Sequence, residues 1–182
     1  MTKTHSTAAT APPAIHFDSE FAAKLASLFQ DLIVFNQTLG LKITEVTHDG
    51  AKAWLPMRPE LIGHPTHQRL HGGVISATLD ALGGLAVMAA VGARHADEPA
   101  DARLARFGKL GTIDLRIDYL RPAIGPSFTA EARVIRLGSR VGTTRMEFYD
   151  AQGRLLSTGA GAYICWRRPK TEPLLRVVPT QN

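Results

Sequence analysis

The segment GGVISATLDALGGLAVMAAVGA, residues 72–93, carries a single charged side chain, Asp80. Its 22 residues are enough to cross a bilayer as a helix, which takes about 20 apolar residues. Five glycines, a central carboxylate and the lack of a basic cluster at its start argue against a membrane span. A helix that is apolar on all sides is otherwise buried within its own domain. The segment therefore predicts a central helix around which the rest of the chain folds.

The start of this helix offers backbone donors to a negatively charged ligand atom. His71-Gly72-Gly73 stands where the helix begins, and the first N–H groups of a helix lack an intrahelical acceptor and carry a partial positive charge. Glycines let a ligand oxygen approach those amides closely, so they can hold the oxyanion that forms when a carbonyl is attacked. The alternative is a helix-entry turn that needs glycine for conformational reasons alone.

Asp80 is the second candidate, because a carboxylate on an apolar helix is costly to bury unless it is hydrogen-bonded. It either pairs with donors as a structural group or faces a cleft as a general base or nucleophile. Gly72 and Asp80 are eight residues apart, about 12 Å along a helix. One reacting carbonyl can therefore touch both only if a second, antiparallel copy of the helix lies alongside, as in a two-fold dimer with two equivalent sites.

Upstream of this segment, the sequence predicts a further helix and a hairpin. Asp18 or Ser19 can cap a helix whose apolar residues recur at helical spacing, and Gly40 supplies its stop. The runs LKITEVTH and AKAWLPM then flank Asp49-Gly50, which is a signal for a tight hairpin. Residues 58–70 contain two prolines, a glycine and two histidines, and we expect an irregular loop there.

Downstream, residues 94–109 are charged and turn-like, and the hydrophobic period then changes to two. Strands are predicted at 112–119, 127–137, 142–149 and 154–166. The apolar positions expected on the buried face of the first strand are Ile113, Leu115, Ile117 and Tyr119. Because helices and strands are segregated along the chain, the pattern favours an α+β fold in which one antiparallel sheet curls around the central helix.

The composition of the 182-residue chain limits its class further. The length suits one domain, which we place at 15–168, between a tail at 1–14 and an arm or tail at 169–182. The first tail has no apolar run, so we expect no secretory signal and a cytoplasmic protein. A single Cys165 excludes an intramolecular disulfide and multi-cysteine metal sites. The net charge of +5 points to an anionic partner.

The residues at the helix and beyond it resemble a known family. The pattern His71-Gly72-Gly73, then Asp80 nine residues after the histidine, then a strand ending Tyr119-Leu120-Arg121-Pro122, resembles the hotdog-fold acyl-CoA thioesterases. The most similar branch is the phenylacetate-degradation (PaaI-like) type within the 4-hydroxybenzoyl-CoA thioesterase superfamily, and the resemblance covers about residues 20–166. It implies an α+β hotdog fold, with an antiparallel sheet wrapped around one long central helix and here an extra N-terminal helix. It also implies hydrolysis of acyl-CoA thioesters, without a cofactor, by homodimers that often pair into tetramers.

The resemblance assigns roles to single residues. The N–H of Gly72 would polarise the thioester carbonyl, and Asp80 of the neighbouring subunit would activate water or attack the carbonyl itself. His71 would help to shape the site, and Thr112 matches a Ser or Thr that positions the water or the carboxylate. His64 stands in the loop where the family often has an asparagine, and whether it takes over that role stays open.

The acyl group would lie among apolar residues of the helix, and CoA would run outward along basic surface. The expected substrate-binding residues are Gly73, Val74, Leu79, Arg121, Gly138, Ser139 and Arg140. Of these, Arg121 and Arg140 are candidates to meet the CoA phosphates, the alternative being ordinary solvated arginines. Two other functions stay open, namely a hotdog module that binds or senses acyl-CoA without hydrolysing it, and a hotdog hydratase or dehydratase.

Other classes of site fit the sequence less well. His64, His67 and His71 resemble a metal cluster, but no carboxylate lies nearby at ligand spacing, so we expect no metal. The excess positive charge would suit nucleic acid, but the basic residues are dispersed and no aromatic residues interleave with them as stacking platforms. We therefore expect neither nucleic-acid binding nor membrane insertion, and assign the anionic partner to CoA.

Overall fold

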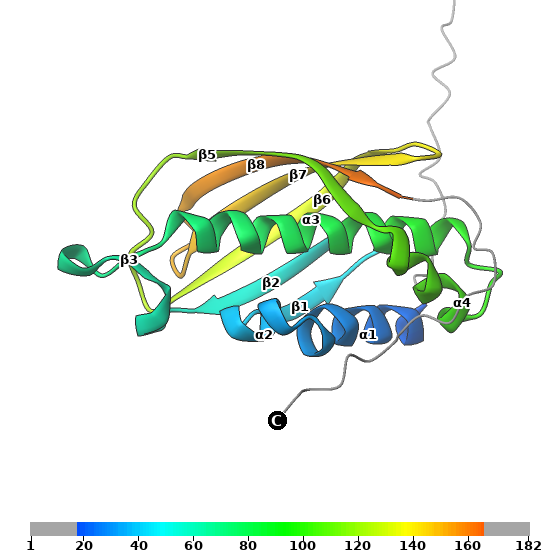
Figure 1. Cartoon of the computed structure of the whole chain (residues 1–182), viewed down its shortest axis with the longest axis horizontal. Helices are drawn as coiled ribbons and strands as arrows, with labels where there is room; N and C mark the ends of the chain where they lie inside the picture. Colours follow the sequence, from blue (N-terminus) through cyan, green and yellow to red (C-terminus); the bar gives the residue numbers. More distant parts are fainter. Residues whose placement is uncertain (1–17, 166–182) are drawn as a thin grey trace, which may run out of the picture.

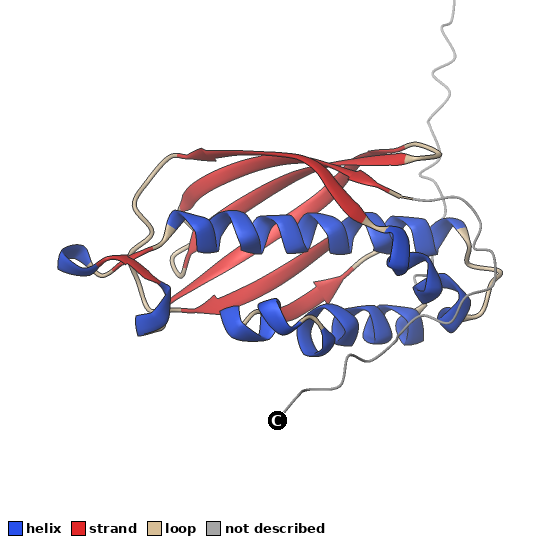
Figure 2. Cartoon of the chain, viewed as in Figure 1, coloured by secondary structure: helices blue, strands red, loops and turns tan. Residues whose placement is uncertain are grey.

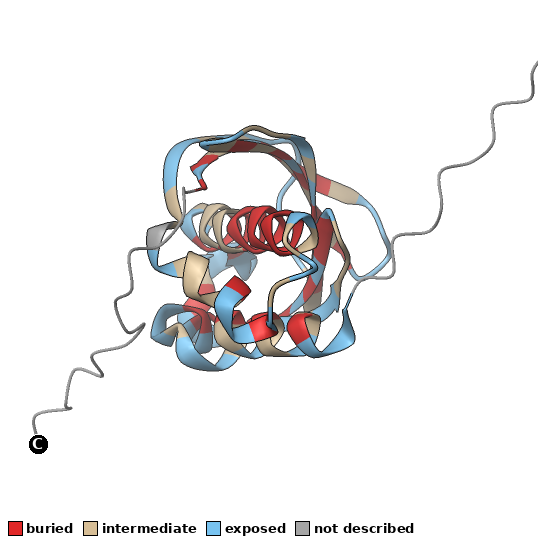
Figure 3. Cartoon of the chain, turned by 90° about the vertical axis from the view of Figure 1, so that its right-hand side faces the viewer, coloured by how far each residue is buried: buried red, intermediate tan, exposed pale blue. Residues whose placement is uncertain are grey.

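The apolar segment forms helix α3, Gly72–Arg94, in a computed structural model that describes residues 18–165. The helix runs through the middle of the domain, and the sheet curves over it and down one side (Figures 1 and 3). By length and hydropathy α3 could cross a membrane, but 78% of its most apolar 18-residue window is buried inside the domain. That is the burial of a core helix, as predicted from the sequence.

Six strands form one antiparallel sheet in the order β1-β2-β6-β7-β8-β5. Their bounds are Lys42–Val46 (β1), Gly50–Pro56 (β2), Gly111–Tyr119 (β5), Ser127–Leu137 (β6), Val141–Asp150 (β7) and Leu155–Ile164 (β8). Figure 2 shows the strands gathered in one curved layer, with the shorter helices on the side of α3 that this layer leaves open. A sheet curled around one long helix is the hotdog architecture, so the predicted fold class is confirmed.

The predicted N-terminal helix is present but divided. Its parts are α1 (Ser19–Ser27), a π-helical turn (Leu28–Leu32) and α2 (Val34–Leu39). Ile33 breaks the helix, since its extended backbone (φ −84°, ψ 101°) cannot continue the α-helical ladder. The predicted ends are correct, because the Asp18 carboxylate accepts bonds from two backbone N–H groups of α1 and Gly40 ends α2 in the left-handed region at φ 74°. A hydrogen bond from Arg103 holds the pKa of Asp18 below its ordinary value.

The two stretches on either side of α3 are more ordered than their sequences predict. The loop before α3 contains a two-stranded ribbon, β3 (Ile62–His64) and β4 (Arg69–Leu70), with a 3-10 turn before each strand. The connection after α3 contains α4 (Ala100–Leu104) and a 3-10 turn at Ala105–Lys109. The prediction of an irregular loop at 58–70 was therefore wrong in part. A strand of two or three residues is too short to show a hydrophobic period.

A β-bulge changes which side chains of β5 face inward. The pairing of β5 with β8 shifts by one residue between Thr112 and Asp114, which leaves Ile113 as the extra residue. Ile113 is 57% exposed, so its predicted place on the buried face was wrong. Leu115 and Ile117, beyond the bulge, are partly buried and pack against the core as predicted. Tyr119, at the end of the strand, is 54% exposed, so its predicted place on the buried face was also wrong.

Two neighbouring glycines in α3 meet very different surroundings. A Cβ on Gly83 would overlap the Tyr163 hydroxyl oxygen and lie 2.7 Å from Met146 Sδ, whereas a Cβ on Gly84 would come no closer than 3.2 Å to Leu110 Cδ2. We expect Gly83→Ala to lower the free energy of unfolding by about 1–3 kcal/mol, the usual cost of overpacking. Gly84→Ala, the matched control, gains helix propensity and is expected to lose nothing. Urea unfolding followed by circular dichroism measures both, and equal stability of the two variants would contradict the prediction.

Candidate active site

Asp80 lies half-buried on the third turn of α3, where β5 passes beside the helix. The hydroxyl of Thr112 donates to Asp80 Oδ1 at 2.9 Å. Thr112 lies immediately before the bulged residue of β5, and bulges re-aim side chains in this way next to functional sites. The structure thus brings together two of the predicted catalytic residues, and their chemical roles stay a prediction.

Tyr163 supports the turn of helix that carries Asp80, and sequence reasoning missed it. Its hydroxyl donates to the backbone carbonyl oxygen of Asp80 at 3.2 Å and touches Met146 Sδ at 3.7 Å. Burial, and after it the negative charge of Asp80, raises the pKa of Tyr163 far above its ordinary value, so it remains a donor. Tyr163 pairs with Thr112 across β5 and β8, which links it to the site. This pairing could have pointed to Tyr163 only if the β5–β8 register had been known from the sequence.

An apolar hollow of about 280 Å³ opens beside Asp80 and Thr112. Its apolar lining includes Phe29, Ile33, Phe35, Ala81, Phe107 and Leu110. These residues come from the N-terminal helices, from α3 and from the connection to β5. An apolar cavity with a few polar groups at one edge is the usual form of a small-molecule site, and here Asp80 supplies the charge.

The start of α3 has one free backbone donor. His71 caps the helix with extended backbone (φ −67°, ψ 135°), and its Nδ1 accepts a bond of 2.9 Å from the N–H of Gly73. The N–H of Gly72 has no acceptor among residues 18–165, while its carbonyl accepts a bond of 3.0 Å from the Tyr119 hydroxyl. Gly63 fits closely under His71, since a Cβ there would lie 2.6 Å from His71 Cα. Of the two glycines, Gly72 is therefore the one whose N–H is free to donate to a ligand, and its role as oxyanion donor stays a prediction.

A second hollow, of about 420 Å³, lies at this helix start. It is lined by Gly72, by Arg69 on one side, and by Tyr119 and Arg121 where β5 ends. The Arg121 guanidinium donates to the Leu155 carbonyl oxygen at 2.8 Å, which fixes it near the rim. The hollow is basic, whereas the hollow at Asp80 is apolar and acidic. Each chain thus carries two unlike hollows, and Gly72 and Asp80 at their edges are eight residues, or about 12 Å, apart along α3.

Several predicted binding residues lie elsewhere. Gly138, Ser139 and Arg140 form the turn between β6 and β7, near the end of α3, where Arg94 donates to the Gly138 carbonyl oxygen at 3.1 Å. That turn and the start of α3 are at opposite ends of the molecule (Figure 1). Leu79 is 0% exposed, so it packs in the core and lines neither hollow. Within one chain, then, these residues do not meet the helix start or the cavity beside Asp80.

Val74 and His64 stay close to the helix start without facing either hollow. Val74 is buried in the core, and His64 stacks on His67 with ring centroids 4.8 Å apart. His64 Nδ1 is buried and has no partner among the described residues. In the described part of the chain, no three His, Cys, Asp or Glu side chains are grouped so that they could hold a metal ion.

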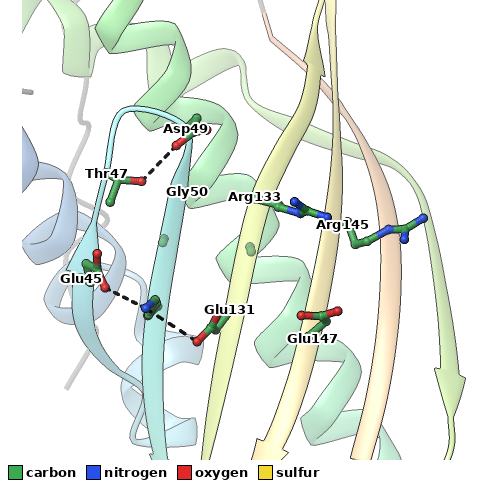
Figure 4. Close-up of a pocket in the computed structure, with 11 residues that line it drawn as sticks. Glu45, Thr47, Asp49, Gly50, Glu131, Arg133, Arg145 and Glu147 are labelled. Atoms are coloured by element: carbon green, nitrogen blue, oxygen red, sulfur yellow. Dashed lines mark hydrogen bonds and ion pairs between the residues drawn. The ribbon is translucent and has the colours of Figure 1, made fainter. Parts of the chain in front are cut away.

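A third hollow lies on the sheet face turned away from α3 (Figure 4). Its lining is mostly charged, and Lys52 bridges Glu45 at 3.2 Å and Glu131 at 3.8 Å across neighbouring strands. Arg133 and Arg145 lie directly opposite each other on β6 and β7. Because the sheet separates it from Asp80 and Gly72, this hollow is not part of the candidate active site.

The curled sheet and its central helix define a hotdog protein, and this helix places a carboxylate beside an apolar cavity and a free amide at its start. The chain belongs to the thioesterase superfamily, whose family model matches residues 67–157. The medium/long-chain acyl-CoA thioesterase YigI of Escherichia coli is 32% identical over 147 residues, which are 80% of this chain and 95% of that protein.

Solved structures agree with this family. A Shewanella oneidensis protein related to the thioesterase superfamily is 39% identical, with a TM-score of 0.77 over 85% of this chain and 99% of its own. Thioesterase HI1161 of Haemophilus influenzae, at 23% identity and a TM-score of 0.62, covers 79% of this chain and 88% of its own and supports the fold alone. The family predicted from the residues is confirmed, and its PaaI-like branch stays a prediction.

Proposed function

We propose that this protein hydrolyses acyl-CoA thioesters to a free acid and CoA. The observation that carries the proposal is the Asp80–Thr112 pair at the edge of an apolar hollow, on the same helix that begins with the free N–H of Gly72. The E. coli relative, which is named as an acyl-CoA thioesterase, supports the choice of thioester over other acyl compounds.

The hollows at Asp80 and Gly72 meet when two chains form a two-fold dimer. β5 is an edge strand that pairs only with β8 among the described strands, and it ends in large exposed apolar side chains at Tyr119 and Leu120. An open edge of this kind favours pairing with a second copy. Antiparallel pairing of two β5 strands would extend the sheet and set the α3 helices side by side, with Asp80 of one chain near Gly72 of the other.

The chemistry follows from this pairing. The Gly72 N–H would donate to the thioester carbonyl oxygen, where negative charge develops during attack. Asp80, held by the Thr112 hydroxyl, would remove a proton from water as it attacks, or would itself attack to give an anhydride that water then cleaves. Either route consumes one water and releases one acid and one CoA. The acyl group would fill the apolar hollow, and Arg69 and Arg121 of the partner's basic hollow would face the phosphates of CoA.

Release of free CoA thiol from a panel of acyl-CoAs tests the proposal. We expect turnover with at least one member of the panel, measured with a thiol reagent against a no-enzyme control. Tight binding of acyl-CoA without thiol release from any member would contradict hydrolysis and favour the acyl-CoA sensor.

The role of the Gly72 N–H can be isolated with proline. Proline is tolerated at the first position of a helix, where it replaces the N–H with a ring carbon, and the extended backbone of His71 suits a residue that precedes proline. We expect Gly72→Pro to lower kcat by about 10²–10³-fold, the usual cost of one oxyanion donor. Gly72→Ala keeps the N–H, and its Cβ would lie 3.4 Å from Tyr119 Cε1, so it should lose far less. Equal losses in steady-state assays would mean that shape, rather than the donor, matters at this position.

A further inference from the structure

The far wall of the hollow beside Asp80 is built by a part of the chain that the superfamily match does not include. Phe29, Ile33, Phe35 and Asn36 line it, whereas the family model begins at residue 67. These residues belong to the π-helical turn and α2, on either side of the break at Ile33. The break therefore shapes this wall of the hollow.

This wall is held in place by a buried amide. Asn36 is 2% exposed, and its Nδ2 donates to the carbonyl oxygen of Phe29 at 2.8 Å. The bond ties α2 to the π-helical turn across the break. The Phe29 ring in turn packs edge-to-face on Phe107, with centroids 5.3 Å apart, which joins this wall to the connection before β5. A fixed wall of aromatic rings can exclude an acyl chain that is too long for the hollow. A mobile loop would move aside and could not do so.

The floor of the hollow runs along α3. Ala77, Ala81 and Gly84 contribute the smallest side chains available, and they extend past Asp80 over about 10 Å of helix. Gly84 is the last of them, and a Cβ there would lie 3.2 Å from Leu110 Cδ2 and 3.8 Å from Phe29 Cε1. A methyl group at Gly84 would therefore press on Leu110 and touch Phe29, which line the same hollow.

The lining also limits the charge of the ligand. Asp80 is the one acidic side chain among the described residues that line the hollow, and no described Lys, Arg or His joins it there. An acyl group that ends in a second carboxylate would be buried without a partner, beside a negative charge. The hollow therefore suits an uncharged, apolar acyl group.

From these contacts we propose that the segment Leu28–Leu39 and Phe107 close the acyl site, that Gly84 sets its depth, and that the substrates are thioesters of uncharged, apolar acyl groups. This inference rests on the proposed acyl-CoA hydrolysis and names the residues that select among acyl groups. One methylene too many or too few in an apolar pocket changes kcat/KM by about 10–200-fold, so a change of one methyl group in the floor is measurable.

The test is a chain-length profile of kcat/KM, from butyryl-CoA to palmitoyl-CoA, for the wild type and two variants. Gly84→Ala adds a methyl group at the end of the floor and is expected to lower kcat/KM for the longest good substrates by about tenfold or more, with short chains little affected. Phe107→Ala opens the wall and is expected to move the optimum to longer chains. Succinyl-CoA, compared with butyryl-CoA, should be a poor substrate of all three proteins.

Two controls carry the same kinds of change outside the hollow. Gly108→Ala adds a methyl group where nothing lies within 4 Å, and Ile135→Ala removes an exposed apolar side chain from β6. Both should give profiles with the wild-type optimum. Profiles of one shape for Gly84→Ala, Phe107→Ala and wild type would overturn the proposal, as would rapid hydrolysis of succinyl-CoA.

Binding measurements distinguish a failure of this inference from a failure of the proposed reaction. The Kd of each acyl-CoA is measured with Asp80→Asn protein, alone and combined with Gly84→Ala or Phe107→Ala. If the wild type released no thiol but these Kd profiles shifted as described, the acyl site would stand and hydrolysis would fail. If hydrolysis were observed and neither profile shifted, the acyl site would be wrong and the reaction would stand.

Discussion

Replacing Asp80 with asparagine is expected to lower kcat for acyl-CoA hydrolysis by about 10²–10⁴-fold, the range for loss of a general base. Asparagine has the same shape and keeps an oxygen that can accept the bond from Thr112, now 2.9 Å to Asp80 Oδ1. It cannot take a proton from water or attack a carbonyl, so the loss falls on the chemical step. Free-thiol release gives kcat, and calorimetric titration with acyl-CoA is expected to show little change in affinity.

Asp114→Asn is the matched control for this variant. Asp114 lies on the same strand as Thr112, two residues away and past the bulge, and it is exposed without an ion pair among the described residues. The Asp114→Asn substitution removes one negative charge and should leave kcat within about twofold, since an exposed charge contributes little. If Asp80→Asn retained full activity, the assignment of Asp80 as base or nucleophile would be wrong under either chemical route.

The central helix and its two candidate site features, Asp80 and the glycines at the helix start, could be predicted from the sequence because each stands out locally. Asp80 is the single charge in an apolar run, and the glycines of His71-Gly72-Gly73 mark a helix start. The bulge at Ile113 could not be predicted, because one inserted residue leaves the alternation intact as a pattern and changes only the pairing with β8. Its effect decides which β5 side chain reaches Asp80.

Other parts of the site depend on bonds and packing that the hydrophobic pattern does not show. The helical period of residues 19–39 continues across Ile33, and the break there is compensated by the bond from Asn36 to Phe29. That bond spans only seven residues, but the helical period gives no sign of it. Leu79 was predicted to meet the acyl group because it is apolar and near Asp80, but it lies on the core side of α3. The hollow instead uses smaller residues of the same helix.

The proposed site between two chains predicts results with mixed dimers that are the reverse of those expected for a site within one chain. In a dimer of one Gly72→Pro chain and one Asp80→Asn chain, one site combines an intact Asp80 with the intact Gly72 of the partner chain, and the other site has both defects. Each homodimer is expected to be nearly inactive. The mixed dimer, purified through two different tags on co-expressed chains, should regain about half of the wild-type kcat, since one of two equivalent sites is whole.

The complementary dimer joins a wild-type chain to a chain that carries both substitutions. If Asp80 and Gly72 act across the interface, each of its sites has one defect, and we expect little activity. If both act within one chain, the wild-type chain keeps a complete site and half of the activity remains, while the first mixed dimer stays inactive. The two dimers contain the same substitutions in equal numbers, so differences in folding or expression cancel. Their ratio of kcat therefore reports only whether the helix start and the carboxylate belong to the same chain, which the distance of about 12 Å along α3 argues against.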